Sequence, residues 1–303
     1  MARKKRTQHV QPTAARPNLP VPLLAVLGCF VLSRILAYAA SIRFDSYRGI
    51  QLMHFIPEEL LRSSLLSSVI HLHNQPPLFN LYLGVVYKLF PGNETTVFHA
   101  VLLLMGAALA VTMYLLMNRL GVTSWVSAAL TCLFIVSPAV VLYENLLYYT
   151  FPVTVMLCLS AFFLFRFMEG GRFLDGVMFF SLLAAIVLTR SLFHVAWFAA
   201  WLSIVIVLGK GRWKKTVLVA AIPFAAALFP FAKNAVLFGG FSSSSWLGMS
   251  LSKISTMKLS EDERIDCISK GELSELSLLP PFKPVWYYKQ YTRIPAFQKT
   301  GVP

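Results

Sequence analysis

Long apolar runs separated by short polar loops dominate the chain. Because a helix needs about 20 residues to cross the hydrocarbon core of a bilayer, most of these runs predict transmembrane helices. The second run and the closely joined pair at 173–208 do not reach this length easily. The pattern therefore predicts an all-α polytopic membrane protein, with apolar segments at 21–42, 77–90, 96–117, 123–142, 148–167, 173–190, 191–208 and 214–236.

Composition excludes an ordinary soluble domain. Hydrophobic residues make up 57% of the chain and charged residues 13%, with a mean hydropathy of +0.65. A soluble domain carries about 25% charged residues. The formal net charge of +14 raises the question of nucleic acid. However, the basic residues lie in the N-terminal tail and in short loops, which is typical of the positive-inside bias of membrane proteins. We expect no nucleic-acid partner.

The basic residues also predict a topology. Residues 1–20 are basic and contain prolines, which favours a disordered tail on the cytoplasmic side. If every apolar segment crossed, giving about eight spans, the basic stretch 210–215 would fall on the outer side, against that bias. If 77–90 stays on the outer side, about seven segments cross. We prefer this second arrangement, because it makes the loop charges cytoplasmic: Arg119, Arg166, Arg172 and the 210–215 group.

Three parts follow from this topology. A cytoplasmic tail covers residues 1–20, and a transmembrane bundle covers residues 21–240. The first outer loop of the bundle, residues 43–76, contains an amphipathic segment that begins at Pro57 and suits a helix on the membrane surface. Residues 241–303 are more polar and form an extracytoplasmic extension. No closing element follows, so we expect this extension to be incomplete.

The first outer loop holds the most suggestive chemistry. Asp45 is flanked by Arg43 and Arg48. Neighbouring cations favour an ionised carboxylate, which can act as a general base towards a hydroxyl or amine. The alternative is that Asp45 only caps or solvates the end of the first helix. His71 and His73 are spaced like metal ligands but have no evident partners, so we assign no metal site.

Several motifs give a resemblance to a known superfamily. Asp45 and a surface helix precede the run His73-Asn74-Gln75-Pro76-Pro77-Leu78-Phe79-Asn80. Further on come Ser137-Pro138 with Tyr143-Glu144-Asn145, and then the stretch 231–239 followed by 244–248. In order and in position these motifs resemble the integral-membrane GT-C glycosyltransferases, which include protein O-mannosyltransferases and lipid A aminoarabinose transferases. The resemblance covers about residues 30–250 and implies a GT-C-like fold.

The chain departs from the family pattern in three respects. Gln75 stands where the family usually has histidine, and the acidic position is a single Asp45 instead of an acidic pair. The family also usually has more crossings, with a further C-terminal bundle or domain. The chain therefore looks like a C-terminally truncated member.

The resemblance implies a reaction as well as a fold. Such enzymes take a sugar from a polyprenyl-phosphate donor and pass it to a lipid, glycan or protein acceptor on the outer face. The resemblance implies that Asp45 is the general base in this chain. A lipid phosphate needs cations at the membrane surface. Lys233, Arg190 and Arg34 are the candidates. The alternative to phosphate binding is a structural role. The side chains of Arg34 and Lys233 would then only extend their charges to the membrane interface, and Arg190 would only mark a turn between helices.

Other polar residues complete the candidate substrate site: Arg43, His73, Gln75, Glu144 and Asn234. Glu144 holds the acceptor or forms a structural ion pair. Asn234 contacts the donor or bonds to loop backbone. The sequence leaves open whether a divalent cation takes part, and no other cofactor is expected.

Two other classes of function compete with this one. The first is a transporter or flippase for a lipid-linked substrate, which repeats and interrupted helices at the bilayer midplane would favour. The second is an inactive GT-C-like scaffold. In each case we expect an integral membrane protein with a cytoplasmic N-terminus, in the plasma (inner) membrane of a bacterium or the endoplasmic reticulum of a eukaryote.

Overall fold

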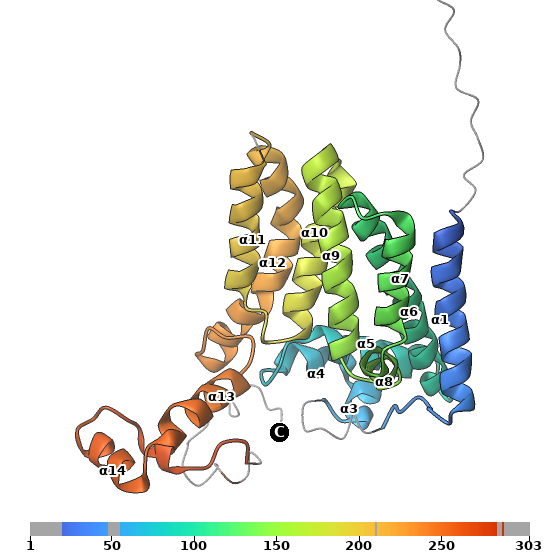
Figure 1. Cartoon of the computed structure of the whole chain (residues 1–303). Coiled ribbons are helices and arrows are strands. Elements are labelled where there is room, and N and C mark those ends of the chain that lie inside the picture. Colours follow the sequence, from blue (N-terminus) through green and yellow to red (C-terminus); the bar gives the residue numbers. More distant parts are fainter. Residues whose placement is uncertain (1–19, 48–54, 210, 284–286, 288–303) are drawn as a thin grey trace, which may run out of the picture.

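The computed structural model describes residues 20–47, 55–209, 211–283 and 287, and within them the chain is helical, with no strand. The all-α prediction is confirmed for this part of the chain. Arg48, the predicted tail (Pro20 apart) and the far end of the extension lie outside the described residues. The helices are α1 (Val21–Ala39), α3 (Glu58–Ser63), α4 (Leu65–His71), α5 (Leu78–Leu89), α6 (Glu94–Arg119), α7 (Ser124–Ile135), α8 (Pro138–Glu144), α9 (Thr150–Gly170), α10 (Phe173–Thr189), α11 (Val195–Leu208), α12 (Trp213–Phe238), α13 (Trp246–Ile254) and α14 (Glu261–Ser269) (Figure 1).

Within the described residues four helices, α1, α6, α9 and α12, are long and apolar enough to cross a membrane. The bent pair α7 and α8 makes a fifth if it forms one span. Helices α10 and α11, with 17 and 14 residues, are apolar but shorter, as their segments predicted. In each long helix only 28–39% of the most apolar stretch is buried inside the protein. The remaining apolar surface faces outward, where a bilayer would cover it.

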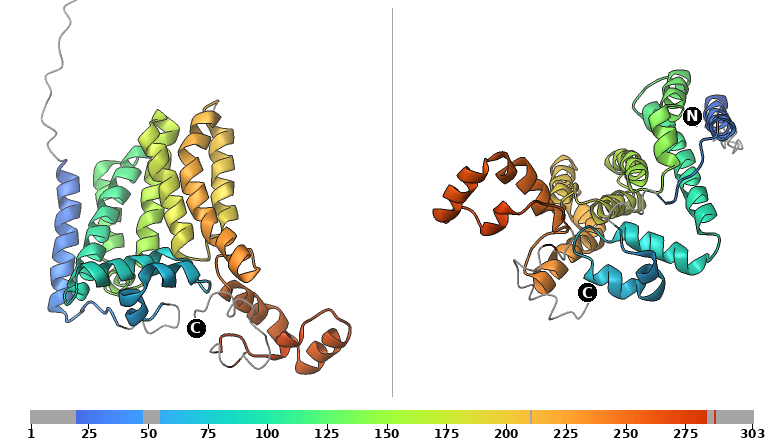
Figure 2. Two further views of the ribbon diagram at one scale, coloured as in Figure 1. Left: turned by 180° about the vertical axis from the view of Figure 1, so that it is seen from behind. Right: turned by 90° about the horizontal axis from the view of Figure 1, so that it is seen from below.

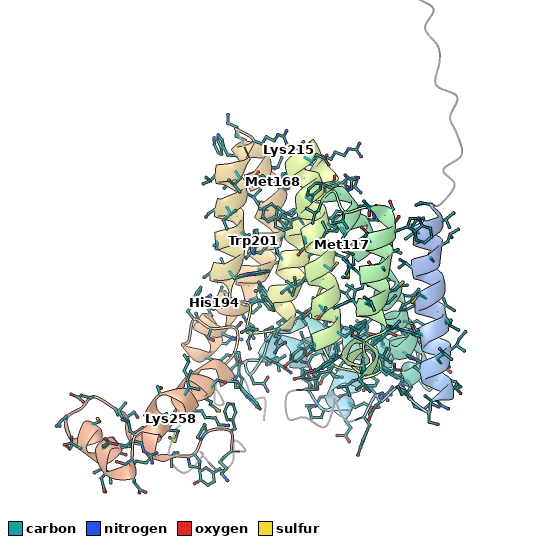
Figure 3. All side chains as sticks on the ribbon, in the orientation of Figure 1. Met117, Met168, His194, Trp201, Lys215 and Lys258 are labelled. Carbon is teal, nitrogen blue, oxygen red and sulfur yellow. The ribbon has the colours of Figure 1, made fainter. Side chains whose placement is uncertain are left out.

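The bundle has two distinct ends (Figures 1 and 2). At one end, which we call the α5 end, lie the described parts of the first loop, α3 to α5, α8, the connection from α10 to α11, and α13 and α14. The opposite end carries the connections α6–α7, α9–α10 and α11–α12. His194 lies towards the α5 end, and Lys215 marks the opposite end (Figure 3). Helix α5 lies across the bundle, on the same side as the first loop, as in the preferred topology.

Aromatic residues fill the core between α9, α10, α11 and α12. Phe179, Phe180, Phe198 and Phe231 are fully buried there. The rings of Phe180 and Phe198 lie 5.7 Å apart between centroids, within the range of favourable aromatic pairs. A second cluster joins α1 to α6 and α7. The aromatic core between α9, α10, α11 and α12 fixes the ends of α10 and α12, which carry candidate site residues.

The predicted segment 123–142 is not one straight helix, which corrects the sequence prediction. Helix α7 ends at Ile135, α8 begins at Pro138, and the two are bent by 61°. Proline has no N–H to continue the helical ladder and pushes the residue before it into an extended conformation. Ser137 adopts that conformation, with φ −60° and ψ 140°. The break turns α8 across the α5 end.

The surface helix predicted from Pro57 is also divided. Helices α3 and α4 meet at Ser64, whose backbone leaves the helical region. Leu61 and Leu65 are buried in a cluster with α5, whereas Leu66 is exposed. One part of the apolar stripe therefore packs against α5, and the other part is exposed on the surface of the protein. This packing holds the segment that leads to His73 against the bundle.

Candidate functional site

Asp45 is held by main-chain pairing with the loop after α8. Its N–H donates to the carbonyl of Asn145 at 2.8 Å, and its carbonyl accepts from the N–H of Leu147 at 3.0 Å. The carboxylate accepts from the N–H of Tyr47 at 2.9 Å, a local turn that fixes the side chain. Because α1 ends at Ala39, Asp45 does not cap that helix. It lies partly exposed where two sequence-distant loops meet.

Arg34 and Glu144 form a buried ion pair. The Nε and Nη2 atoms of Arg34 donate to the two carboxylate oxygens of Glu144, each at 2.8 Å. The side chains are only 10% and 0% exposed, respectively. Nη1 of Arg34 donates to Ser33 Oγ and to the carbonyl of Ile135, at 2.9 and 2.8 Å. Of the alternatives raised for Glu144, the structure supports the structural ion pair. Arg34 lies in this pair and not among the loop residues where a donor phosphate was predicted.

Close packing surrounds this pair. The Arg34 guanidinium lies 4.3 Å from the centroid of the Phe30 ring. A Cβ atom on Gly106 of α6 would lie 2.1 Å from Glu144 Oε2 and 2.9 Å from a Phe30 ring carbon. Glycine is therefore needed where α6 passes the ion pair. The pair thus ties α1, α6 and α8 together at one point.

Tyr148 and Tyr149 follow the loop that pairs with Asp45, and they lie beside Arg190. The rings of Tyr148 and Tyr149 stack with centroids 4.1 Å apart, and the Tyr148 hydroxyl donates to that of Tyr149 at 2.7 Å. The Arg190 guanidinium lies 5.5 Å from the centroid of the Tyr149 ring. Burial, and then the hydrogen bond to Tyr149, raise the pKa of Tyr148, which keeps its hydroxyl protonated. Arg190 has no carboxylate partner among the described residues, so its charge is available to an anion.

A second cluster forms around Lys233. Its ammonium donates to the carbonyl of Leu72 and lies 5.7 Å from the centroid of the Phe238 ring. The N–H of Ser245 donates to the carbonyl of His73 at 2.9 Å, and His73 Nδ1 lies 3.2 Å from Ser245 Oγ. Residues 72–74 are therefore attached to α12 and to the serine loop, residues 242–245.

This second cluster contains polar atoms without partners. Asn234 Nδ2 donates to the carbonyl of Ser242 at 2.6 Å, as the loop-backbone alternative for this residue predicted. Its Oδ1 is buried and unpaired, as are Oδ1 of Asn74 and Nε2 of Gln75. A buried polar atom without a hydrogen bond costs about 1–3 kcal/mol. Two acceptors and one donor match what water or the hydroxyls of a sugar would satisfy.

His73 is neutral at ordinary pH. Although part of its side chain reaches solvent, desolvation by its neighbours and then the positive charge of Lys233 lower its pKa. A neutral imidazole offers both a donor and an acceptor nitrogen. His73 therefore suits hydrogen bonding to an uncharged ligand group.

Apart from Arg34, Glu144 and Arg43, the predicted site residues lie at the α5 end in two clusters. One contains Asp45 and Arg190, and the other contains His73, Gln75, Lys233 and Asn234. Phe79 at the start of α5 packs against the first cluster, because its ring centroid lies 5.9 Å from that of Tyr149. Arg43 turns away from both, since its guanidinium stacks 3.7 Å over the Tyr38 ring and donates to the Tyr38 carbonyl.

The site also contains residues that the sequence reasoning did not single out. Tyr148 and Tyr149 carry no motif, and only their place at a predicted outer helix end could have suggested them. Within the described residues, no group of three or more His, Cys, Asp or Glu side chains is placed to hold a metal ion.

No family model, curated protein or solved structure matches this chain. Assignment to the GT-C superfamily therefore remains a proposal based on the sequence motifs and on the site geometry.

Replacing Lys233 by methionine is expected to destabilise the protein by about 1.5–3 kcal/mol, because the Leu72 carbonyl loses a charge-assisted hydrogen bond. Thermal unfolding in detergent measures this loss. Lys253→Met is the matched control, since Lys253 is exposed and has no partner in the described chain. The pKa of His73 should rise in the Lys233 variant, followed by NMR titration. Equal unfolding temperatures for the two variants would contradict the proposed role of Lys233.

Proposed function

We propose that this protein is a membrane glycosyltransferase that moves a sugar from a polyprenyl-phosphate donor to an acceptor, with Asp45 as the general base. One observation carries the proposal. Polar residues from the first loop, the loop after α8, the end of α10 and the end of α12 converge at the α5 end of the bundle. This convergence supplies a base, two cations and unpaired polar atoms on one side of an apolar bundle.

The roles follow from the chemistry of each group. Asp45 accepts the proton of an acceptor hydroxyl or amine as that group attacks the anomeric carbon. The bond from this carbon to the phosphate oxygen breaks, and polyprenyl phosphate leaves with the electron pair. Arg190 and Lys233 stabilise the charge that develops on the leaving phosphate. Asn74, Gln75 and Asn234 bind sugar hydroxyls with their unpaired atoms.

The same proposal includes the topology. Helices α10 and α11 cross the membrane beside the longer helices, giving about seven crossings. The α5 end then lies on the outer or lumenal side, and the N-terminus is cytoplasmic. The polyprenyl chain remains in the bilayer, along the outward apolar faces of the bundle, while its phosphate reaches the loops. This arrangement places donor and acceptor where lipid meets water.

The proposal is tested with purified protein in vesicles that contain polyprenyl-phosphate-linked sugars, hexoses and pentoses in turn. We expect label to move from the lipid to an added acceptor and free polyprenyl phosphate to appear in equal amount. Empty vesicles control for spontaneous hydrolysis. If no sugar in the panel is transferred by protein that folds and inserts, the enzymatic assignment is wrong.

The interrupted span α7–α8 favours a second candidate, a flippase for a lipid-linked substrate. Broken helices are typical of transporters, although theirs lie near the bilayer midplane. Here the break turns α8 across the α5 end, at the edge of the bundle. The same vesicles separate the two functions, since a flippase moves the labelled lipid between leaflets and leaves its sugar attached.

A further inference from the structure

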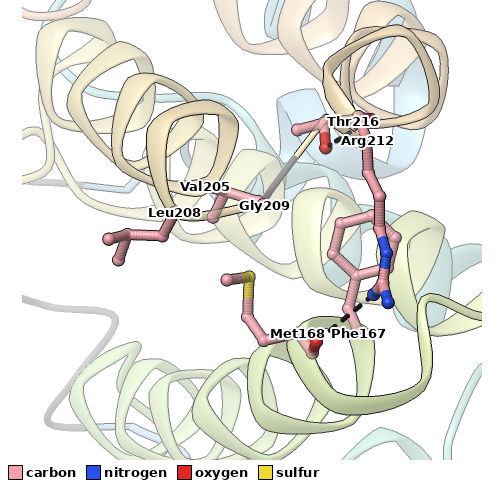
Figure 4. A pocket seen from close by; sticks show the side chains of 7 residues that line it. All are labelled: Phe167, Met168, Val205, Leu208, Gly209, Arg212 and Thr216. Atoms are coloured by element: carbon pink, nitrogen blue, oxygen red, sulfur yellow. Dashed lines mark hydrogen bonds between the residues drawn. The ribbon is translucent and has the colours of Figure 1, made fainter.

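A cavity of about 340 Å³ lies at the end of the bundle opposite α5, between α9, α11 and α12 (Figure 4). This volume is at the lower end of the range for ligand pockets, about 300–1,000 Å³. Helix α11 packs mainly against α12, and the cavity lies between α11 and the last turns of α9. The lining residues are Phe167, Met168, Val205, Leu208, Gly209, Arg212 and Thr216.

The cavity combines an apolar wall with a single cation. Phe167, Met168, Val205 and Leu208 supply the wall, and Arg212 extends from the start of α12 towards Phe167 and Met168 (Figure 4). Nη1 of Arg212 donates to the carbonyl of Met168 at 3.3 Å, which holds the guanidinium at the rim. The side chain is exposed and has no carboxylate partner within the described chain. Arg212 is therefore free to bind an anion.

A neighbouring glycine makes room for this guanidinium. Gly171 ends α9 with φ +59°, a left-handed conformation that glycine adopts without strain. A Cβ atom at this position would lie 2.7 Å from Arg212 Nη1. The turn after α9 thus admits Arg212 to the rim of the cavity.

Uncompensated positive charge lies at this end of the bundle. The two acidic residues here are already paired: Glu169 with Arg119 and Asp175 with Arg166, each at 3.0 Å. Met168 and Lys215 lie at this same end (Figure 3). The basic residues without a carboxylate partner in the described part of the chain are Arg172, Arg212, Lys214 and Lys215. An anionic ligand would therefore be attracted to this rim.

We propose that the cavity binds one anionic phospholipid of the leaflet at this end, with its phosphate on Arg212 and part of an acyl chain along Phe167, Val205 and Leu208. A free phosphate would gain nothing from the apolar wall, whereas a phospholipid uses both surfaces. Val207 and Leu208 are 78% and 60% exposed beside Arg212, so the cavity adjoins exposed apolar surface that an acyl chain could cover. This inference is independent of the proposed enzymatic activity.

The test measures binding of a fluorescent short-chain phosphatidylglycerol to the purified protein in detergent. We expect Arg212→Gln to bind at least about tenfold more weakly, because a hydrogen bond to a charged group is lost. Leu208→Trp should weaken binding similarly by filling the apolar part of the cavity. Lys253→Gln, at the other end of the molecule, should bind like the wild type.

Three results would overturn the proposal. One is equal binding of the wild type and both cavity variants. Another is equal affinity for phosphatidylcholine, which carries no net charge. The third is displacement of the lipid by inorganic phosphate at similar concentration, which would indicate an anion site without lipid. The last two use the wild-type protein only, so they decide the question even if a variant fails to fold. Thermal unfolding without lipid checks the folding of each variant.

Discussion

The Asp45→Asn variant is expected to lose sugar transfer by about 100-fold or more while inserting and folding like the wild type. A positioned general base contributes about 10²–10⁴-fold to rate, and an amide cannot accept the proton. Asparagine keeps an oxygen that can accept from the N–H of Tyr47, so the local turn should persist. The pairing with Asn145 and Leu147 uses only main-chain atoms and is unaffected. The substitution therefore separates chemistry from structure.

Transfer from polyprenyl-phosphate-linked sugar in vesicles measures this effect. Glu59→Gln is the matched control, because Glu59 is an exposed carboxylate in the same loop region. It should retain full activity. Full activity in the Asp45 variant would remove Asp45 from the mechanism. Loss of activity together with loss of insertion would instead assign Asp45 a structural role.

Replacing Glu144 by glutamine should cost about 3–5 kcal/mol of folding free energy. The Arg34 guanidinium would remain buried in the bundle without a charged partner, and an uncompensated buried charge is strongly destabilising. The exposed pair between Glu58 and Arg62 is the matched comparison, since Glu58→Gln should cost at most about 1 kcal/mol. Thermal unfolding in detergent follows both variants.

A double substitution tests the cause. Replacing Arg34 and Glu144 together by leucine removes both charges and should recover most of the stability lost in Glu144→Gln. The non-additivity of the single and double variants gives the coupling energy of the pair. If the double variant is as unstable as the single one, charge pairing is not what holds α1, α6 and α8 together.

The sequence predicted the helices well because apolar runs define them directly. The predicted segments 148–167 and 214–236 became α9 and α12 with ends displaced by only a few residues. The break inside 123–142 was missed, although Pro138 was visible, because an apolar run continues through it. The division of the surface helix at Ser64 has no such marker and depends on packing against α5.

The site residues were identified from the sequence less completely. The pattern of apolar segments placed Asp45, His73 and Lys233 near helix ends. Their hydrogen-bonding partners, however, are set by tertiary contacts. Lys233 bonds to a carbonyl 161 residues earlier, and Arg34 pairs with a carboxylate 110 residues later. Such pairings leave no local pattern. The sequence could therefore suggest Arg34 as a phosphate ligand but could not reveal its bonds to Glu144.

The Arg34–Glu144 pair has a consequence for biosynthesis. The chain is made from its N-terminus, so Arg34 enters the membrane 110 residues before its partner exists. Until α8 emerges, α1 carries an unpaired charge in its apolar segment. Such a charge costs about 2.5–3.5 kcal/mol at a helix centre on insertion scales, and less at Arg34, which lies near the end of α1. The first helix is therefore held only provisionally while α3 to α7 are synthesised. Its final seating is a late event, completed when Glu144 arrives.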